Sequence, residues 1–363
     1  MSTKPFFFLG IIIAVAVFCY TISPYFNCCY HHDPHKRNLL NQTYPILIYI
    51  YIYIYYIRLR EKKKIECKRF FFLLNSNFII IWWRERERKG KNKMLVREEQ
   101  IDSITRYGKN PLHIFIWTPF IENYPRAQFP GIILFSEIYQ VTETVRRLAK
   151  RIASNGYIVM SPSLFHNFVG SEPLPFNNQG KEDGNDYKIQ KPLDSYDEDI
   201  DICCKKLYEM ANFDGRGIGA TGMCLGGHLA FRSLLNESVC CATCFSPTDI
   251  DSKTLGFGMN DNTLSRITKE VGPSKELLLI FGTESTKIGS KGRELIRDNL
   301  RSNGINFSIL ELMDTDTNFI SDERDNDKFN PTLSECCFSL MFEQFNRRLK
   351  TSLGCYTTTN EEK

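Results

Sequence analysis

The chain has 363 residues, of which 42% are hydrophobic and 24% charged, as expected for a globular protein of one large domain or two smaller ones. The net charge of +4 is unevenly distributed, because residues 1–93 hold 16 Lys and Arg against 5 Asp and Glu, which leaves 30 basic and 37 acidic residues in 94–363. An acidic body argues against nucleic acid as a partner, since binding to phosphate backbones requires a basic surface.

Residues 1–93 form a basic, apolar leader with no core of its own. The charge-free run 6–22 follows Lys4, is near the lower length limit for a membrane-spanning helix and has no clear cleavage site, so it predicts a transmembrane signal anchor. The Tyr/Ile alternation that begins at Tyr44 is apolar on both faces and is typical of low-complexity sequence.

A second interpretation of the leader is that it is a gene-model artefact. Strict Tyr/Ile alternation is what a TA-repeat tract encodes in one reading frame, and Met94 would then be the true start. We therefore expect a cytoplasmic body that is anchored to a membrane only if residues 1–93 are translated.

Residues 94–363 alternate between strand-like and helix-like segments from about Pro111 onward. We expect strands at 112–118, 131–137, 157–163, 217–223, 239–246, 276–282 and 306–312, and helices at 142–156, 194–213 (capped by Asp194), 226–235, 290–304 and 331–349. Residues 164–193, rich in Gly, Pro and Asn, are expected to be a long loop that lines a site. This alternation predicts one α/β domain whose mostly parallel sheet is flanked by helices on both faces, with ligands bound along the carboxyl ends of the strands.

The chain has 13 cysteines, several in adjacent pairs, without zinc-site or disulfide-framework spacing. We expect the thiols of the body to be reduced.

One cysteine stands out, within "GATGMCLGGHLAF" at 219–231. G-x-C-x-G between a strand and a helix is the thiol form of the nucleophile elbow, which predicts that Cys224 projects above the sheet edge. The N–H of Leu225 would stabilise an oxyanion, and the helix dipole would lower the thiol pKa. The alternative is a buried structural cysteine at a Gly-rich helix start.

Four stretches, "FSEIYQVTETVRRLAKRIASNGYIVMSPSLFH", "ATGMCLGGHLAF", "FGTESTKIGSKGRELI" and "FISDERDNDKFNP", make 94–363 resemble the dienelactone hydrolase family. The resemblance implies an α/β-hydrolase fold, hydrolysis of enol-lactones and related esters, no metal or organic cofactor, and a triad in the order Cys, Asp, His. It further implies that Glu137 contacts the cysteine and that the N–H of Ile138 is the second oxyanion donor.

The other two triad positions depart from the family pattern. The Asp position is Ser285, the His position is Thr317, and an arginine often found four residues later is Ser321. No histidine follows His228, which lies four residues beyond the cysteine and is expected to pack or cap. His166 follows a strand end and is the other histidine that could approach the site.

Two hypotheses about function remain open. The first is a hydrolase of small esters or lactones, in which Cys224 attacks and Glu137 assists as base if desolvation raises its pKa. Loss of one triad member lowers the rate by roughly 10³–10⁶-fold, so activity would be weak. The second is a catalytically dead pseudoenzyme that binds a small ligand or a protein partner; a membrane-anchored scaffold depends only on 6–22. We expect a monomer or weak dimer.

Overall fold

The computed structural model describes residues 72–74, 77–79, 94–122, 124–323 and 326–350. The chain divides into two compact units, Met1–Lys89 and Gly90–Lys363. In the first, β1 (Phe72–Leu74) and β2 (Asn77–Ile79) pair antiparallel. The predicted anchor at 6–22 and the Tyr/Ile tract lie outside the described residues. No helix in the described ranges is long and apolar enough to cross a membrane.

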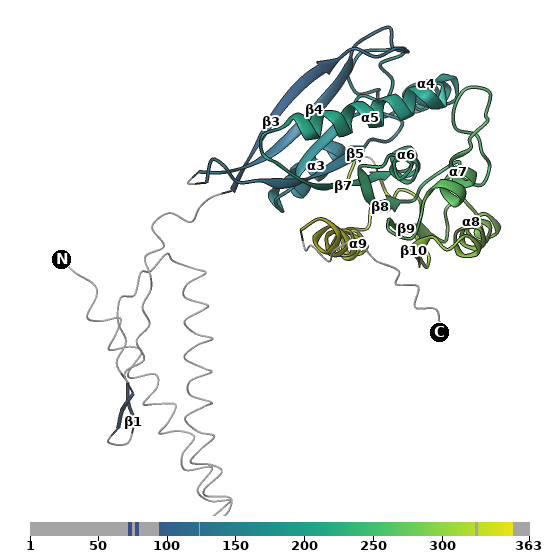
Figure 1. The fold of residues 1–363 in the computed structure, drawn as a ribbon. Helices are drawn as coiled ribbons and strands as arrows, with labels where there is room; N and C mark the ends of the chain where they lie inside the picture. Colours follow the sequence, from purple (N-terminus) through teal and green to yellow (C-terminus); the bar gives the residue numbers. More distant parts are fainter. Residues whose placement is uncertain (1–71, 75–76, 80–93, 123, 324–325, 351–363) are drawn as a thin grey trace, which may run out of the picture. The chain divides into compact units, whose positions relative to one another are not determined.

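The described part of the second unit is built on a sheet of eight strands (Figure 1). Six neighbouring strands run parallel, whereas β4 pairs antiparallel with both β6 and β3. The predicted mostly parallel α/β sheet is confirmed. In spatial order the strands are β10 (Asn306–Leu312), β9 (Glu276–Gly282), β8 (Val239–Phe245), β7 (Phe213–Met223), β5 (Phe129–Phe135), β6 (Ile158–Pro162), β4 (Leu112–Ile121) and β3 (Met94–Ser103).

Helices cover both faces of this sheet, and Figure 1 shows α5 and α9 on opposite sides of it. The central strands are continuous apolar runs because both of their faces are buried; every residue of β5 is buried. One apolar layer is formed with α3 (Glu143–Ser154) and α9 (Pro331–Phe345), which continues into a π-helical turn at Asn346–Lys350. The other is formed with α5 (Leu193–Glu209), α6 (Leu225–Ser233), α7 (Thr263–Glu270) and α8 (Ser290–Ser302).

The long connection at 164–193 differs from the prediction, because it contains the helix α4 (Asn178–Gln190). This helix has no apolar stripe; the two residues it buries fully are Gly180 and Gly184. The Asn177 side chain caps it by accepting from the Gly180 N–H at 2.9 Å. A Cβ on Gly184 would lie 2.5 Å from the Ile138 carbonyl oxygen. Close backbone packing therefore fixes α4, and that leaves no hydrophobic periodicity to detect.

Three smaller differences concern β3, α7 and the start of α5. The strand β3 is mostly exposed and is held by its ten-residue ladder with β4. The helix α7 has eight residues, too few to establish a period. The cap of α5 is Pro192, with Asp194 in the first helical turn, so the predicted cap is wrong by two residues.

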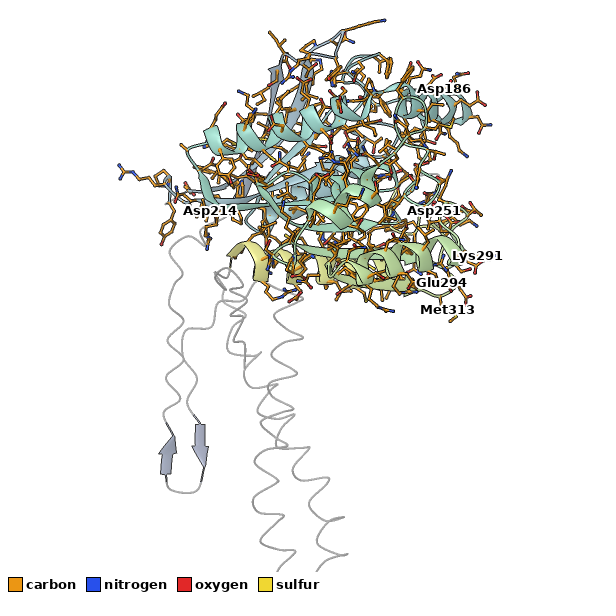
Figure 2. The ribbon with its side chains drawn as sticks, turned by 45° about the vertical axis from the view of Figure 1, so that its right-hand side comes forward. Asp186, Asp214, Asp251, Lys291, Glu294 and Met313 are labelled. Atoms are coloured by element: carbon orange, nitrogen blue, oxygen red, sulfur yellow. The ribbon has the colours of Figure 1, made fainter. Side chains whose placement is uncertain are left out.

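The carboxyl ends of the parallel strands meet at one edge of the sheet. Figure 2 shows Asp251, which follows β8, and Met313, which follows β10, at the end of the unit opposite Asp214, which lies at the start of β7. The segments after β5, β7, β8, β9 and β10 therefore share this edge, where parallel α/β proteins place their sites.

Candidate active site

The turn between β7 and α6 has the geometry of an elbow. Cys224 has φ 54° and ψ −116°, a conformation that side-chain-bearing residues rarely adopt. A Cβ on Gly222 would lie 2.4 Å from the Gly226 backbone, and one on Gly226 would lie 2.2 Å from the Phe135 carbonyl oxygen. The Cys224 N–H donates to the Phe245 carbonyl at 3.0 Å, so backbone on both sides holds the strained turn.

The Cys224 side chain is partly exposed and lies among charged groups. Burial raises the pKa of its thiol to about 11, and the charges of Glu137 and Asp249 act in the same direction. The Leu225 amide and the Lys287 ammonium oppose this effect but are weaker. The predicted lowering of the thiol pKa by the helix dipole is therefore wrong, because desolvation and two carboxylates outweigh one helix terminus.

The turn after β5 brings Glu137 to the same place. Part of its surface is accessible, yet the surrounding protein removes enough water to raise the pKa of its carboxyl group to about 7. The neighbouring Ser321 hydroxyl partly offsets this rise, although among the described residues it makes no hydrogen bond of regular geometry. The charge of Glu323 adds to it, and one carboxyl oxygen of Glu323 is buried without a hydrogen-bond partner in the described chain. Glu323 is thus a site residue that the sequence did not reveal.

The two candidate oxyanion donors belong to the two turns that bring Cys224 and Glu137 together. The amide of Leu225 is at the first position of α6, where helical N–H groups have no partner within the helix. The amide of Ile138 belongs to the Glu137 turn. In the described ranges neither amide takes part in the backbone hydrogen bonds of loops and caps. The Tyr139 ring packs on Phe176 at 4.7 Å between centroids, which places an aromatic wall beside this turn.

The two altered triad positions meet each other. The Thr317 hydroxyl donates to the Ser285 hydroxyl at 2.7 Å, and the Lys287 N–H also points at Ser285, at 3.3 Å. The loops after β9 and β10 are joined by a backbone bond from Glu284 to Thr315 at 3.0 Å. The loops after β9 and β10 therefore place Thr317 and Ser285 in contact. A hydroxyl has no basicity near pH 7, so this pair cannot accept the thiol proton.

The three histidines of the described chain each lie within 3.3 Å of a carboxylate other than Glu137. His166 is fully buried with its Nε2 2.9 Å from Asp199, and the Nδ1 of His113 lies 2.6 Å from Asp102. His228 bonds to the Thr248 carbonyl and faces a carboxylate below the elbow. Neither His166 nor His228 hydrogen-bonds the thiol. His31, His32 and His35 lie outside the described residues.

Asp249 is a second site residue without a sequence signal. Its backbone is left-handed, with φ 65°, and its carboxylate accepts from Lys188 of α4 at 2.9 Å and from Thr254 at 2.7 Å. This ion pair joins the loop after β8 to α4 above the site. The described residues contain no group of three or more His, Cys, Asp or Glu side chains placed to hold a metal ion.

Comparison with known proteins identifies the family. The family model "Dienelactone hydrolase family" matches residues 120–349. The chain belongs to the dienelactone hydrolase family. A Saccharomyces cerevisiae protein provisionally assigned as a carboxymethylenebutenolidase is 52% identical over 267 residues, which cover 74% of this chain and 97% of that protein. A Synechocystis protein with the same provisional assignment is 23% identical over 198 residues, 54% of this chain and 78% of that protein.

Solved structures of dienelactone hydrolase type share the fold. A protein from Klebsiella pneumoniae, provisionally named a dienelactone hydrolase, superposes with a TM-score of 0.60 at 18% identity, covering 70% of this chain and all of that one. A dienelactone hydrolase-like promiscuous phosphotriesterase from metagenomic libraries gives 0.53 at 12% identity, with 70% and 98% coverage. The expected α/β-hydrolase fold is thereby confirmed, and this dienelactone hydrolase family member is a hydrolase by class.

Proposed function

We propose that this protein hydrolyses small esters or lactones through a Cys224 thiolate, slowly, with Glu137 as its general base. The observation that carries the proposal is the pairing of an elbow thiol with a carboxyl group whose pKa is about 7, close enough for their charges to interact. A base with a pKa near the working pH is well suited to proton transfer. The provisional carboxymethylenebutenolidase assignment of the yeast relative supports the same substrate class.

The reaction follows from these groups in two halves. Glu137 takes the thiol proton, the Cys224 sulfur attacks the ester carbonyl, and the amides of Ile138 and Leu225 stabilise the oxyanion. The carbon–oxygen bond then breaks, and the leaving oxygen recovers the proton from Glu137. Water, activated by the same carboxylate, hydrolyses the thioester to the acid and restores the thiol.

Proton transfer is the weak step. The thiol pKa of about 11 lies above that of Glu137 at about 7, so transfer of the thiol proton to Glu137 in the resting site is unfavourable. In place of an imidazole and its orienting carboxylate, the loops after β9 and β10 supply only Thr317 and Ser285. We therefore infer that turnover favours leaving groups that need little protonation, such as enolates and phenolates.

A series of aryl and alkyl acetates tests this proposal on the full chain. We expect slow hydrolysis that rises steeply as the leaving-group pKa falls, and an acetyl adduct on Cys224 in the intact mass spectrum. Cys224→Ala should abolish both signals, whereas Cys336→Ala, at an exposed cysteine, should preserve them. Equal rates for aryl and alkyl esters would show that an efficient acid acts in the site and would refute the Glu137 mechanism.

The alternative is a pseudoenzyme that binds a small ligand or a protein partner in the same site. The hydrogen bond from Thr317 to Ser285 favours this alternative, because the two hydroxyls satisfy each other and neither can act as a base. Ligand-dependent stabilisation equal in Cys224→Ala and wild type, with no adduct and no turnover, would establish this function.

We further propose that the body of the protein is cytoplasmic and acts as a monomer or weak dimer, with any membrane attachment confined to the leader. Cell fractionation tests the location, and analytical ultracentrifugation tests the oligomeric state.

A further inference from the structure

His228 lies on α6, one turn beyond Cys224, and its side chain is fully buried. The Nδ1 atom is 2.6 Å from the Thr248 carbonyl oxygen. A carbonyl oxygen can only accept a hydrogen bond, so Nδ1 carries a proton. A neutral ring would then have a bare Nε2 that needs a donor.

The groups around Nε2 are acceptors. Nε2 is 3.2 Å from the Thr263 hydroxyl and 3.3 Å from Oδ2 of Asp261. The Thr263 proton is directed elsewhere, because this hydroxyl lies 2.6 Å from Oδ1 of Asp261 and must donate to it. Thr263 also accepts from Arg232 at 2.9 Å. Oδ2 of Asp261 is buried without a hydrogen-bond partner of regular geometry in the described chain. Both neighbours of Nε2 therefore present lone pairs to it.

We propose that His228 is a buried imidazolium ion, paired with Asp261, that positions the segment Thr248–Asp249 beside the reactive thiol. Both ring nitrogens then donate, Nδ1 to the Thr248 carbonyl and Nε2 to the Thr263 hydroxyl, with Oδ2 of Asp261 3.3 Å from Nε2 as the counter-charge. An uncharged ring would leave a lone pair on Nε2 facing Oδ2 of Asp261 in a sealed space, which is electrostatically unfavourable.

The charges packed around the ring agree with this protonation state. Arg232 of α6 lies 3.7 Å from Asp261 and binds Asp197 of α5 through two bonds of 2.7 Å. Arg266 of α7 lies 3.5 Å from Asp197 and 2.8 Å from Glu270. With His228 charged, this cluster holds as many cations as anions. Burial acts to raise the pKa of Asp261, yet its pKa is lowered, and the contact with His228 is the largest of the causes that lower it.

The positioned segment connects the ring to the site. The Thr248 carbonyl that His228 holds precedes Asp249, whose left-handed backbone directs its carboxylate to Lys188 of α4. The charge of Asp249 also raises the pKa of the Cys224 thiol. This positioning role rests on the proposed function, whereas the protonation state of His228 does not.

Nitrogen-15 NMR of histidine side chains in the full chain tests the protonation state. We expect both ring nitrogens of His228, assigned by His228→Gln, to be protonated at pH 7. Asp261→Asn should convert the ring to the neutral form with a proton on Nδ1 alone. His113, partly exposed and paired with the exposed Asp102, is the matched control and should be unaffected by Asp261→Asn. A neutral His228 ring in the wild type at pH 7 would overturn the proposal.

Alkylation of Cys224 by iodoacetamide, followed against pH, tests positioning without requiring turnover. Loss of the hold on Thr248 releases Asp249, so the thiol pKa should fall and alkylation at pH 8 should be about threefold faster in His228→Gln. His228→Met, which also removes the Nδ1 donor, is the second variant should His228→Gln not fold, and His113→Gln should match the wild type. An unchanged rate in a folded variant contradicts the positioning role. Absence of ester turnover in every variant would count against the hydrolase proposal alone.

Discussion

The candidate site has two halves that differ in what the chain supplies. On one side, the elbow and the Glu137 turn combine a strained backbone with reactive groups, and glycines at 222 and 226 make the close approach possible. On the other, the loops after β9 and β10 come together as closely, yet present two hydroxyls bonded at 2.7 Å. Parallel strands fix where loops meet, but side chains at the loop tips decide the chemistry. The side chains in one half of the site can therefore differ while the arrangement of strands and loops stays the same.

Removing the thiol tests the first half and has the largest expected effect. Cys224→Ala leaves no nucleophile on the elbow, so ester hydrolysis and acyl-adduct formation should fall to the buffer rate. Hydrolysis of phenyl acetate with intact mass analysis measures both. Residual turnover above background in this variant would place the chemistry elsewhere.

Rebuilding the second half should give the next largest change. Ser285→Asp together with Thr317→His places a carboxylate and an imidazole at two positions already in contact, and should raise kcat/KM by roughly 10²–10⁴-fold. Each single substitution should give little, because triad members act as a unit. No gain in the folded double variant would mean that these loops do not face the thiol.

Neutralising the base should lower activity and raise stability. Glu137→Gln should reduce kcat/KM by about 10²-fold. The pKa of Glu137 is raised from its ordinary value to about 7, so the folded state binds this proton more tightly than the unfolded chain. The free energy that this tighter proton binding adds to the folded state is fully present at acid pH and is lost as the pH rises through about 7. The variant should therefore gain about 2 kcal/mol in the free energy of unfolding at pH 8 and little at pH 4.

The expected pattern in urea unfolding is thus a pH-dependent difference between Glu137→Gln and wild type. The exposed Glu284→Gln on the same edge serves as the control and should show no such difference. Equal stability differences at both pH values would contradict the raised pKa.

A smaller effect is expected at the neighbouring carboxylate. Glu323 raises the pKa of Glu137, so Glu323→Gln should move the acid limb of the pH–rate profile to lower pH by less than one unit. Steady-state rates between pH 5 and 9 measure this shift. A move to higher pH would show that Glu323 does not act on Glu137 through its charge.

The parts of the fold with strong local patterns were predictable. The strands expected at 276–282 and 306–312 coincide with β9 and β10, because both are short runs rich in apolar residues with clear ends. The helix α4 was missed because backbone contacts at its glycines, rather than an apolar stripe, hold it in place.

In the site, sequence placed Cys224 on its turn because glycine spacing is a local requirement. It gave the wrong direction for the thiol pKa, since that depends on Glu137 and Asp249, which approach only in the folded chain. Glu323 was missed for the same reason. The catalytic roles of Cys224, Glu137, Ile138 and Leu225 stay predictions until they are assayed.

The contact of Gly184 with Ile138 ties the position of α4 to the position of a proposed oxyanion donor. The α4 backbone rests on the Ile138 carbonyl, the Leu174 N–H holds the Tyr139 carbonyl at 3.0 Å, and the Gln140 side chain donates to Gly170 and Glu172 at 2.9 and 2.8 Å. An outward movement of α4 and of residues 170–174 would displace the peptide that carries the Ile138 amide, which we propose as one of the two oxyanion donors. A ligand that can enter only when α4 moves away would displace this amide as it binds, so its ester bond could not be cleaved. The site is therefore expected to act on molecules that enter while α4 stays in place.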